Sequence, residues 1–480
     1  MRVPLFGGSY EARSIIANAQ RCVNLYPEKN PEDSPSPYTY YPTPGLTLLA
    51  TPPTQAAGRG LYATTNGKLY AVVGNTVYNV DSSFVMTVIG TIGTTTNPVS
   101  MVDNGLDAVL VDGTLNTGYQ INLGTNVMTV ISSPGFYGAD RVDYMDTYLL
   151  FNRPDTKEFY ISGSNAVTFD PLDLAAKTGF PDLLQAVIVM QREIWLIGQR
   201  TTELWYNSGS ADFPFQRMPG SFVEHGCVAK YSVAMQDLSV YWLSQDEQGQ
   251  RMVLAGTGYQ AKRISTHAIE KEFSEYTTVS DAIGHTYQQQ GHTFYVLSFP
   301  SADKTWVYDV SQGLWHERAW SDSNGNLHRV RGAFHAAVYG KNIVQDWETG
   351  KLYELSLSSF TDDGDDVVRI RSGAHLVGGN FNRVSYLSFT ADIQVGTDDG
   401  SIDGTSASNP PKVSLRWSDT RGATWGSPIT QSLGAVGQFA TTVTWHRLGM
   451  ARDRVFELSW SVPAAVALNG AFINVVESET

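Results

Sequence analysis

Stretches in which apolar and polar residues alternate recur along the chain from about residue 57 to residue 360. The apolar positions are rich in aromatic and β-branched residues, and Gly, Asn or Asp separates neighbouring stretches, as in antiparallel hairpins. Seven such hairpins align, and they start at Gly67, Leu106, Asp146, Arg192, Leu238, His292 and Lys341. The starts lie about 40 to 50 residues apart, a period typical of β-propeller blades with four short strands. The pattern predicts an all-β fold with a divergent β-propeller of about seven blades over residues 57–360.

The two flanks of this repeat have patterns of their own. Residues 1–56 do not follow the repeat, and the stretch 27–45 is rich in Pro, Ser and acidic residues, which favours extended chain. We expect residues 1–56 to form an extended N-terminal arm that packs against a neighbouring subunit or ring. Beyond residue 360, short alternating runs between turn residues predict a C-terminal β-sandwich-like domain over residues 361–480. The alternative to a propeller is an array of unrelated hairpins in β-sandwiches.

The net charge argues against binding to nucleic acid. The 480 residues include 33 Lys and Arg against 47 Asp and Glu, so the formal net charge is -14. Proteins that bind phosphate backbones normally present a basic stripe, whereas the basic runs at 329–332 and 369–372 are short and isolated. We expect no sequence-specific binding of nucleic acid.

The apolar runs are too short for a membrane-spanning helix, which needs about 18 residues. The first ten residues lack the apolar core of a secretory signal. We therefore expect no membrane insertion and no such signal.

Two cysteines, Cys22 and Cys227, are too few for a disulfide framework or a CxxC metal site. On a strand, His225 and Cys227 would face the same side, but a thiol nucleophile also needs a third group to orient its base. Cys22 follows Arg21 and has no histidine close in sequence. We interpret both thiols as buried apolar groups and expect no catalytic residue.

Acidic clusters at 361–366 and 396–404 suggest calcium binding at first sight. Neither cluster has the residue order of an EF-hand loop, so we expect solvated turns, with a loosely bound surface ion as the alternative. The sequence also has no HExxH motif and no phosphate-binding glycine loop. We expect no metal site and no cofactor.

The sharpest local motif is SDTRGATWG at 418–426. It resembles the Asp-box of sialidases, S-x-D-x-G-x-T-W, at Ser418, Gly422, Thr424 and Trp425, but Thr420 stands in place of the aspartate. In that family the box is a structural hairpin remote from catalysis. Here it occurs once and lies outside the predicted propeller.

Taken together, NAQRCVNLYPE at 18–28, PTPGL at 42–46, the divergent repeats and the late WSDTRGATWG resemble the tail-hub family of P22-like short-tailed bacteriophages. Its members are also called packaged-DNA stabilisation proteins. Most of the resemblance lies in Asn24, Leu25, Tyr26, Pro27 and Glu28, which we interpret as a family-like assembly motif.

The resemblance implies a homohexameric ring below the portal and adaptor ring, with a tail needle at its distal end and tailspikes nearby. Such a ring closes the DNA exit channel and retains the packaged genome until ejection. The resemblance also implies a place in the tail of the virion, after assembly in the host cytoplasm.

A glycan-binding or sialidase-like propeller protein is the alternative. Its arguments are the eleven tryptophans and the degenerate Asp-box. The mass of the native protein at high dilution separates the two hypotheses, because the first expects a ring and a monomer suits the second.

Overall fold

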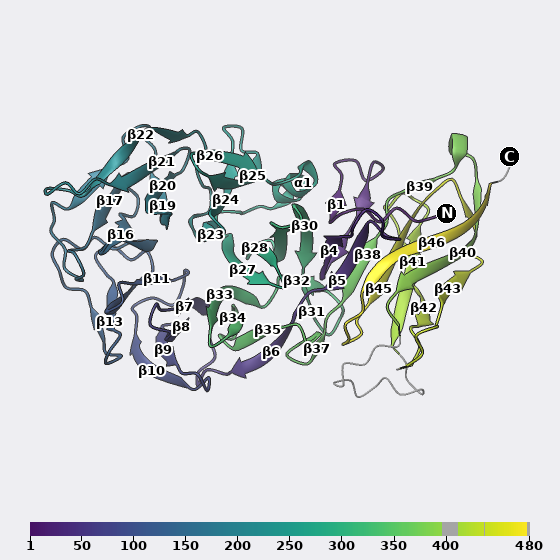
Figure 1. Ribbon diagram of the computed structural model, residues 1–480, viewed down its shortest axis with the longest axis horizontal. Helices are drawn as coiled ribbons and strands as arrows, with labels where there is room; N and C mark the ends of the chain where they lie inside the picture. The colour runs from purple at the N-terminus through teal and green to yellow at the C-terminus, as the bar shows by residue number, and fades with distance from the viewer. Residues whose placement is uncertain (396–410, 436, 478–480) are drawn as a thin grey trace.

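The computed structural model describes residues 1–395, 411–435 and 437–477. Figure 1 shows two parts side by side along the long axis: a ring of small sheets and a C-terminal domain built from longer strands. The first strands of the chain lie between these two parts. None of the helices within the described ranges has the length and apolar character needed to span a bilayer.

Seven groups of four antiparallel strands follow one another around the ring, counted over the described residues. The first three groups are β7 (Gly58–Ala63), β8 (Leu69–Val73), β9 (Thr76–Val80) and β10 (Met86–Thr91); β11 (Ser100–Asp103), β12 (Asp107–Val111), β13 (Tyr119–Asn122) and β14 (Met128–Val130); and β15 (Val142–Met145), β16 (Tyr148–Asn152), β17 (Glu158–Ile161) and β18 (Leu174–Ala176). The fourth and fifth are β19 (Leu184–Met190), β20 (Glu193–Gly198), β21 (Thr202–Asn207) and β22 (Phe215–Val223); and β23 (Ala234–Gln236), β24 (Ser239–Gln245), β25 (Arg251–Thr257) and β26 (Gln260–Arg263). The arrangement is that of a β-propeller.

The last two groups are extended by strands from elsewhere in the chain. The sixth group is β27 (Ile283–Gln289), β28 (His292–Phe299), β29 (Lys304–Asp309) and β30 (Leu314–Arg318). The seventh combines β33 (Gly332–Val338), β34 (Lys341–Asp346) and β35 (Leu352–Ser356) with β6 (Gly45–Ala50) from the N-terminal segment. β6 pairs antiparallel with β35 and forms the outer strand of this group.

Each of the seven predicted hairpins is present, as the second and third strands of its group. The hairpin that starts at Gly67, for example, is β8 followed by β9. All five residues of β8 are buried, because both faces of each middle strand pack against neighbouring groups. The apolar character of these strands is therefore a direct signature of the ring.

The ring closes where the seventh group meets the first. β33 lies beside β7, and the buried side chain of Gln345 on β34 joins the two groups. Its Oε1 accepts a hydrogen bond from the Gly60 N–H at 3.1 Å, and its Nε2 donates to the Val72 carbonyl at 3.0 Å. An amide can do both at once, which suits the junction of two sheets.

Two sheets form the C-terminal domain and enclose one core. One continues the sixth propeller group through β38 (Arg369–Ser372), β45 (Asp453–Trp460), β41 (Lys412–Ser418) and β42 (Ile429–Ser432), with β39 (Leu376–Val377) beside β45. The other contains β40 (Val384–Ile393), β43 (Val443–His446), β44 (Met450–Ala451) and β46 (Leu468–Glu477). The core between the sheets includes Phe389, Trp445 and Phe456, which confirms the predicted sandwich.

Strands of the N-terminal segment belong to both parts of the molecule. β3 (Cys22–Val23) pairs in parallel with β30 and antiparallel with β38, so one sheet runs from the propeller into the sandwich (Figure 1). β4 (Leu25–Lys29) and β5 (Tyr38–Pro42) form a hairpin that joins the other sandwich sheet through β46. β1 (Tyr10–Glu11) and β2 (Ala19–Gln20) form a separate small hairpin.

The segment predicted as an arm over residues 1–56 is extended, but it does not stand apart from the two domains. Cys22, Val23, Leu25 and Tyr40 are fully buried within the chain. The composition did not reveal this burial, because the apolar residues occur in runs of only a few residues and pack against residues far away in the sequence. The strands up to β6 thus have partners in their own chain, and contact of this segment with a neighbouring subunit stays a prediction.

The remaining elements are short. They are the helix α1 (His267–Glu275), the 3-10 turns η1 (Lys230–Ser232) and η2 (Gly379–Phe381), and the strand pairs β31 (Trp320–Ser321) with β32 (Leu327–His328) and β36 (Thr361–Asp362) with β37 (Asp365–Asp366). Thr266 caps α1, because its side chain accepts a hydrogen bond from the Ile269 N–H.

Candidate assembly site at the domain junction

Asn24 holds the propeller, the sandwich and the β4–β5 hairpin together. Its φ of 53° lies in the left-handed region, which Asn tolerates better than most residues. The side-chain amide donates to the carbonyls of Ala319 and Val368, both at 2.8 Å, and its oxygen accepts from the Ala319 N–H at 2.9 Å. The Asn24 carbonyl accepts from the Thr43 N–H at 3.1 Å. Asn24 is 2% exposed, so these bonds are not shared with bulk solvent.

The next two residues bury their side chains in different domains. Leu25 belongs to the sandwich core, whereas Tyr26 packs against Phe294 and Tyr287 of the sixth propeller group. This division follows from the strand, since successive side chains point to opposite faces. Burial raises the pKa of the Tyr26 hydroxyl, which lies 3.2 Å from Gln290 Oε1.

Pro27 and Glu28 complete the motif on β4. Pro27 is buried and lies opposite Tyr40 on β5. The Glu28 carboxylate lies 3.8 Å from Nε2 of His292, whose Nδ1 is 2.7 Å from the Asp309 carboxylate. The hydrogen bond with Asp309 is the main reason that the pKa of His292 is raised. The five motif residues therefore lie together at the seam between the two domains of one chain.

Arg371 on β38 fixes the N-terminal segment to the sandwich. The guanidinium is 1% exposed and has no carboxylate partner among the described residues. It donates to the Arg21 carbonyl at 3.0 Å, to the Gly7 carbonyl at 3.2 Å, and to Gln20 Oε1 and the Tyr40 hydroxyl, both at 2.9 Å. Sequence reasoning missed this residue, although the alternation Val-Arg-Ile-Arg at 368–371 signals that both arginines share one face.

A buried carboxylate pairs with two cations on the other side of β3. Glu317 lies 3.3 Å from the Arg21 guanidinium and 2.9 Å from the Lys304 ammonium. Burial alone would raise the pKa of Glu317, but the charges of Arg21 and Lys304 outweigh burial and lower it. The ion pair between Arg21 and Glu317 connects the start of β3 to β30, the outer strand of the sixth propeller group.

Neither cysteine has the surroundings of a nucleophile. Burial raises the pKa of both the Cys22 and the Cys227 thiol to about 11. Residues 224–229 lie outside any strand, which corrects the expected shared face of His225 and Cys227. The Cys227 thiol donates instead to the Ala229 carbonyl at 2.9 Å. The geometry favours the interpretation as buried structural thiols.

The double substitution Cys22→Ser and Cys227→Ser is expected to leave function intact and to cost about 1 to 3 kcal/mol of stability. The cost arises because a hydroxyl replaces a larger, less polar thiol in a packed core. Denaturant unfolding and a particle assembly assay check this. Iodoacetamide should not label the native wild-type chain, and fast labelling of either thiol would contradict the interpretation.

The acidic cluster at 361–366 forms the β36–β37 turn. Its Asp363 carboxylate accepts from Lys351 at 2.8 Å, while Asp362 is buried at 8% exposure. The expectation of a fully solvated turn is therefore wrong for Asp362. The second cluster, 396–404, lies outside the described residues. Over the part of the chain that the structure describes, no three His, Cys, Asp or Glu side chains are grouped to hold a metal.

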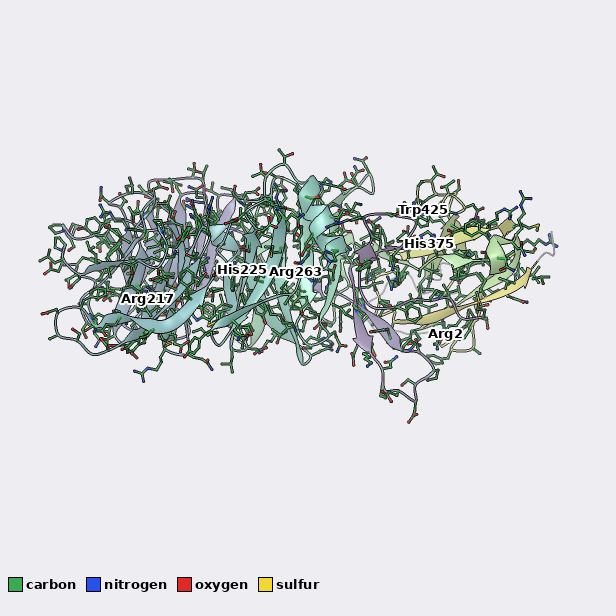
Figure 2. All side chains as sticks on the ribbon, turned by 90° about the horizontal axis from the view of Figure 1, so that it is seen from above. Arg2, Arg217, His225, Arg263, His375 and Trp425 are labelled. Atoms are coloured by element: carbon green, nitrogen blue, oxygen red, sulfur yellow. The ribbon has the colours of Figure 1, made fainter. Side chains whose placement is uncertain are left out.

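The Asp-box-like hairpin is a turn closed by hydroxyl groups. Ser418 Oγ accepts from the Gly422 N–H at 2.8 Å, and Thr420 Oγ1 accepts from the Thr424 N–H at 2.7 Å. Thr420 thus supplies a side-chain acceptor where the motif has aspartate. Trp425 lies on the C-terminal domain (Figure 2), with the Arg416 guanidinium 4.9 Å from its ring. These contacts describe a structural turn.

The solved structures that match this chain share little of its sequence. The "Streptogramin B lyase structure" is 9% identical with a TM-score of 0.43, and covers 64% of this chain and 96% of its own. The "Crystal Structure of the N-terminal Domain of Nup159" is 8% identical with a TM-score of 0.40, and the shares are 70% and 98%. No curated protein matches the chain.

Family models match both parts of the molecule. The model described as "Bacteriophage P22 Gp10, beta-propeller" matches residues 1–359, and the model described as "Bacteriophage P22 Gp10, beta-sandwich" matches residues 381–476. The propeller model includes the N-terminal strands, of which β3 and β6 pair with strands of the propeller. The resemblance seen in the sequence is thereby confirmed, and the chain belongs to the family of bacteriophage P22 Gp10, whose members are phage structural proteins.

Proposed function

We propose that this chain is the tail hub of a short-tailed phage. Six copies form a ring below the portal and adaptor ring, close the DNA exit channel and retain the packaged genome until ejection. The tail needle and the tailspikes are its proposed neighbours in the virion tail, and assembly takes place in the host cytoplasm. The observation that supports the proposal is the match of both Gp10 models, in chain order, to the two domains.

The proposed role is structural and not enzymatic. The motif Asn24–Glu28 serves assembly indirectly, because its first four residues are buried between the domains of one chain. A ring of identical subunits requires every subunit to present its two domains in the same orientation. The hydrogen bonds of Asn24 and Arg371 support this, since they hold both domains to one short segment.

Particles produced without this protein are expected to lose most of their packaged DNA, because the exit channel then lacks its closure. Nuclease-protected DNA per head measures the effect, and expression of the wild-type chain in trans is the control.

The mass of the purified chain, measured by native mass spectrometry at high dilution, is expected to be six times that of one chain. Undiminished protected DNA would contradict the proposed role, and a monomer would contradict the ring.

A further inference from the structure

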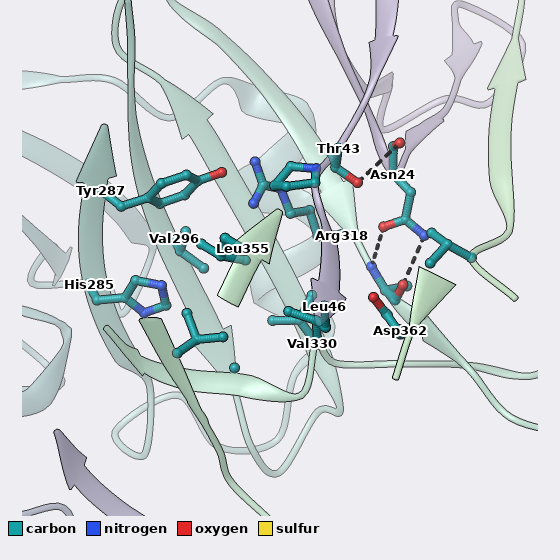
Figure 3. A pocket seen from close by; sticks show the side chains of 15 residues that line it. Asn24, Thr43, Leu46, His285, Tyr287, Val296, Arg318, Val330, Leu355 and Asp362 are labelled. Atoms are coloured by element: carbon teal, nitrogen blue, oxygen red, sulfur yellow. Dashed lines mark hydrogen bonds between the residues drawn. The ribbon is translucent and has the colours of Figure 1, made fainter. Parts of the chain in front are cut away.

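A small cavity, lined by both apolar and polar residues, lies where the sixth and seventh propeller groups meet the N-terminal segment (Figure 3). Its volume is about 40 Å³. The polar side chains that line it include Asn24, His285, Tyr287, Arg318 and Asp362. These residues come from the N-terminal segment, β27, β30 and β36, so the cavity lies at the seam that the assembly motif also occupies.

Arg318 carries a buried charge with no counter-ion. Arg318 is 6% exposed, and among the described residues no carboxylate forms an ion pair with it. Its Nη2 has no hydrogen-bond partner, while Nε lies 3.4 Å from His316 Nε2. The guanidinium lies 5.2 Å from the Tyr287 ring and 5.1 Å from the Phe294 ring. An unpaired buried charge costs several kcal/mol, so a compensating charge in the cavity would be strongly favourable.

A second unpartnered donor faces the same space. Tyr287 is 1% exposed, and its hydroxyl has no hydrogen-bond partner of proper geometry. Figure 3 shows this hydroxyl pointing toward the Arg318 guanidinium. Both groups can donate, and an acceptor placed between them would satisfy both.

We propose that this cavity binds a small monovalent anion, for which chloride is the probe, between Arg318 Nη2 and the Tyr287 hydroxyl. A cavity needs about 10–15 Å³ to hold one water, so the space admits roughly three waters or one ion somewhat larger than water. One guanidinium supplies one positive charge, which matches a monovalent anion better than a dianion. The bound ion would link β27 to β30 within the sixth propeller group.

Asp362 makes this site sensitive to pH. Burial raises the pKa of the Asp362 carboxyl to about 7, although Arg331 and Arg369 pull it down. Below that pH the neutral carboxyl does not repel an anion, and above it the carboxylate competes for the same positive charge. Binding is therefore expected to weaken as pH rises through about 7. The other charged or titratable groups around Asp362 and the cavity are Arg318, Arg331, Asp365, Arg369, Tyr287, His285, His316 and His335.

His285, His316 and His335 do not change charge in this range. Burial lowers the pKa of His285 to about 3 and that of His335 to about 4, and it places the pKa of His316 well below its ordinary value. Burial raises the pKa of Tyr287, so its hydroxyl keeps its proton. Asp362 is thus the group that sets the pH dependence.

The test compares the melting temperature of the full chain in sodium chloride and in sodium gluconate at equal ionic strength, so that screening is the same. Chloride is expected to raise the melting temperature by about 2 °C or more, and by more at about pH 6 than at about pH 8. Arg318→Met should abolish the difference between the salts. Arg217→Met, on the exposed face of β22 and remote from the sandwich (Figure 2), should respond like the wild type.

Equal melting temperatures of the wild type in both salts would show that water fills the cavity and would overturn the proposal. A chloride response that survives Arg318→Met would also overturn it. If Arg318→Met does not fold, crystals of the wild-type chain grown in bromide decide the question. An anomalous peak beside Arg318 is expected, and its absence overturns the proposal.

Discussion

Replacing Asn24 by Ala is expected to lower the free energy of unfolding by about 3 to 5 kcal/mol. The substitution leaves the buried Ala319 N–H and the carbonyls of Ala319 and Val368 without the partner that each has now. Each buried polar group left unpaired costs about 1 to 3 kcal/mol. Denaturant unfolding, followed by probes in both domains, measures the loss. We also expect faster proteolysis of the segment near Val368, because the amide no longer holds it.

Asn116→Ala is the matched control for this substitution. Asn116 has a φ of 52° and is exposed, and its side chain makes no hydrogen bond within the described part of the chain. Its replacement tests the cost of the left-handed backbone alone, which is about 1 to 2 kcal/mol. Equal losses at the two positions would contradict the role assigned to the Asn24 side chain.

The propeller could be predicted because its signal is local. Each hairpin contains its own alternation and its own turn residues within about twenty positions, as in the pair β8 and β9. Repetition of that unit at a nearly regular interval then distinguishes a ring from scattered hairpins. The acidic turn at 361–366 also interrupts the repeat, and the boundary near residue 360 that this interruption suggests stays a prediction.

The junction could not be predicted, because its pairings join residues far apart in the chain. Val23 lies opposite Glu317, and Leu46 lies opposite Leu355. Strands of two to six residues carry too little pattern to reveal such partners. The motif at 24–28 was found as a resemblance, but its position inside the chain depends on contacts that only the fold supplies.

The burial of individual charged residues could not be predicted from the sequence either. Arg371 was part of an isolated basic run, and Asp362 was part of an acidic turn, both of which are ordinarily solvated. Arg371 is buried because the acceptors that surround it come from residues 6–40. Asp362 is buried because the β36–β37 turn packs against β6. The chemical type of such a residue says nothing about the distant groups that enclose it.

Two truncations are expected to separate the contribution of the N-terminal segment to the propeller from its contribution to the junction with the sandwich. A chain that lacks residues 1–35 keeps β6, so the propeller should stay folded and soluble. It loses Val23, Leu25 and Tyr26, whose burial contributes about 1.5 to 3 kcal/mol each. Against a typical stability of about 5 to 15 kcal/mol, this should melt or detach the sandwich and abolish particle assembly.

A chain that lacks residues 1–50 also loses β6, the outer strand of the seventh propeller group. The edge of β35 is then unpaired, and the apolar side chains that packed against Leu46 are exposed. We expect this chain to aggregate or to unfold without a cooperative propeller transition, whereas the shorter truncation should retain one in calorimetry. The same propeller transition in both truncated chains would show that the propeller does not need β6. Normal particle assembly by the chain that lacks residues 1–35 would show that the junction is dispensable, since β3 and β4 supply the backbone that joins the two domains.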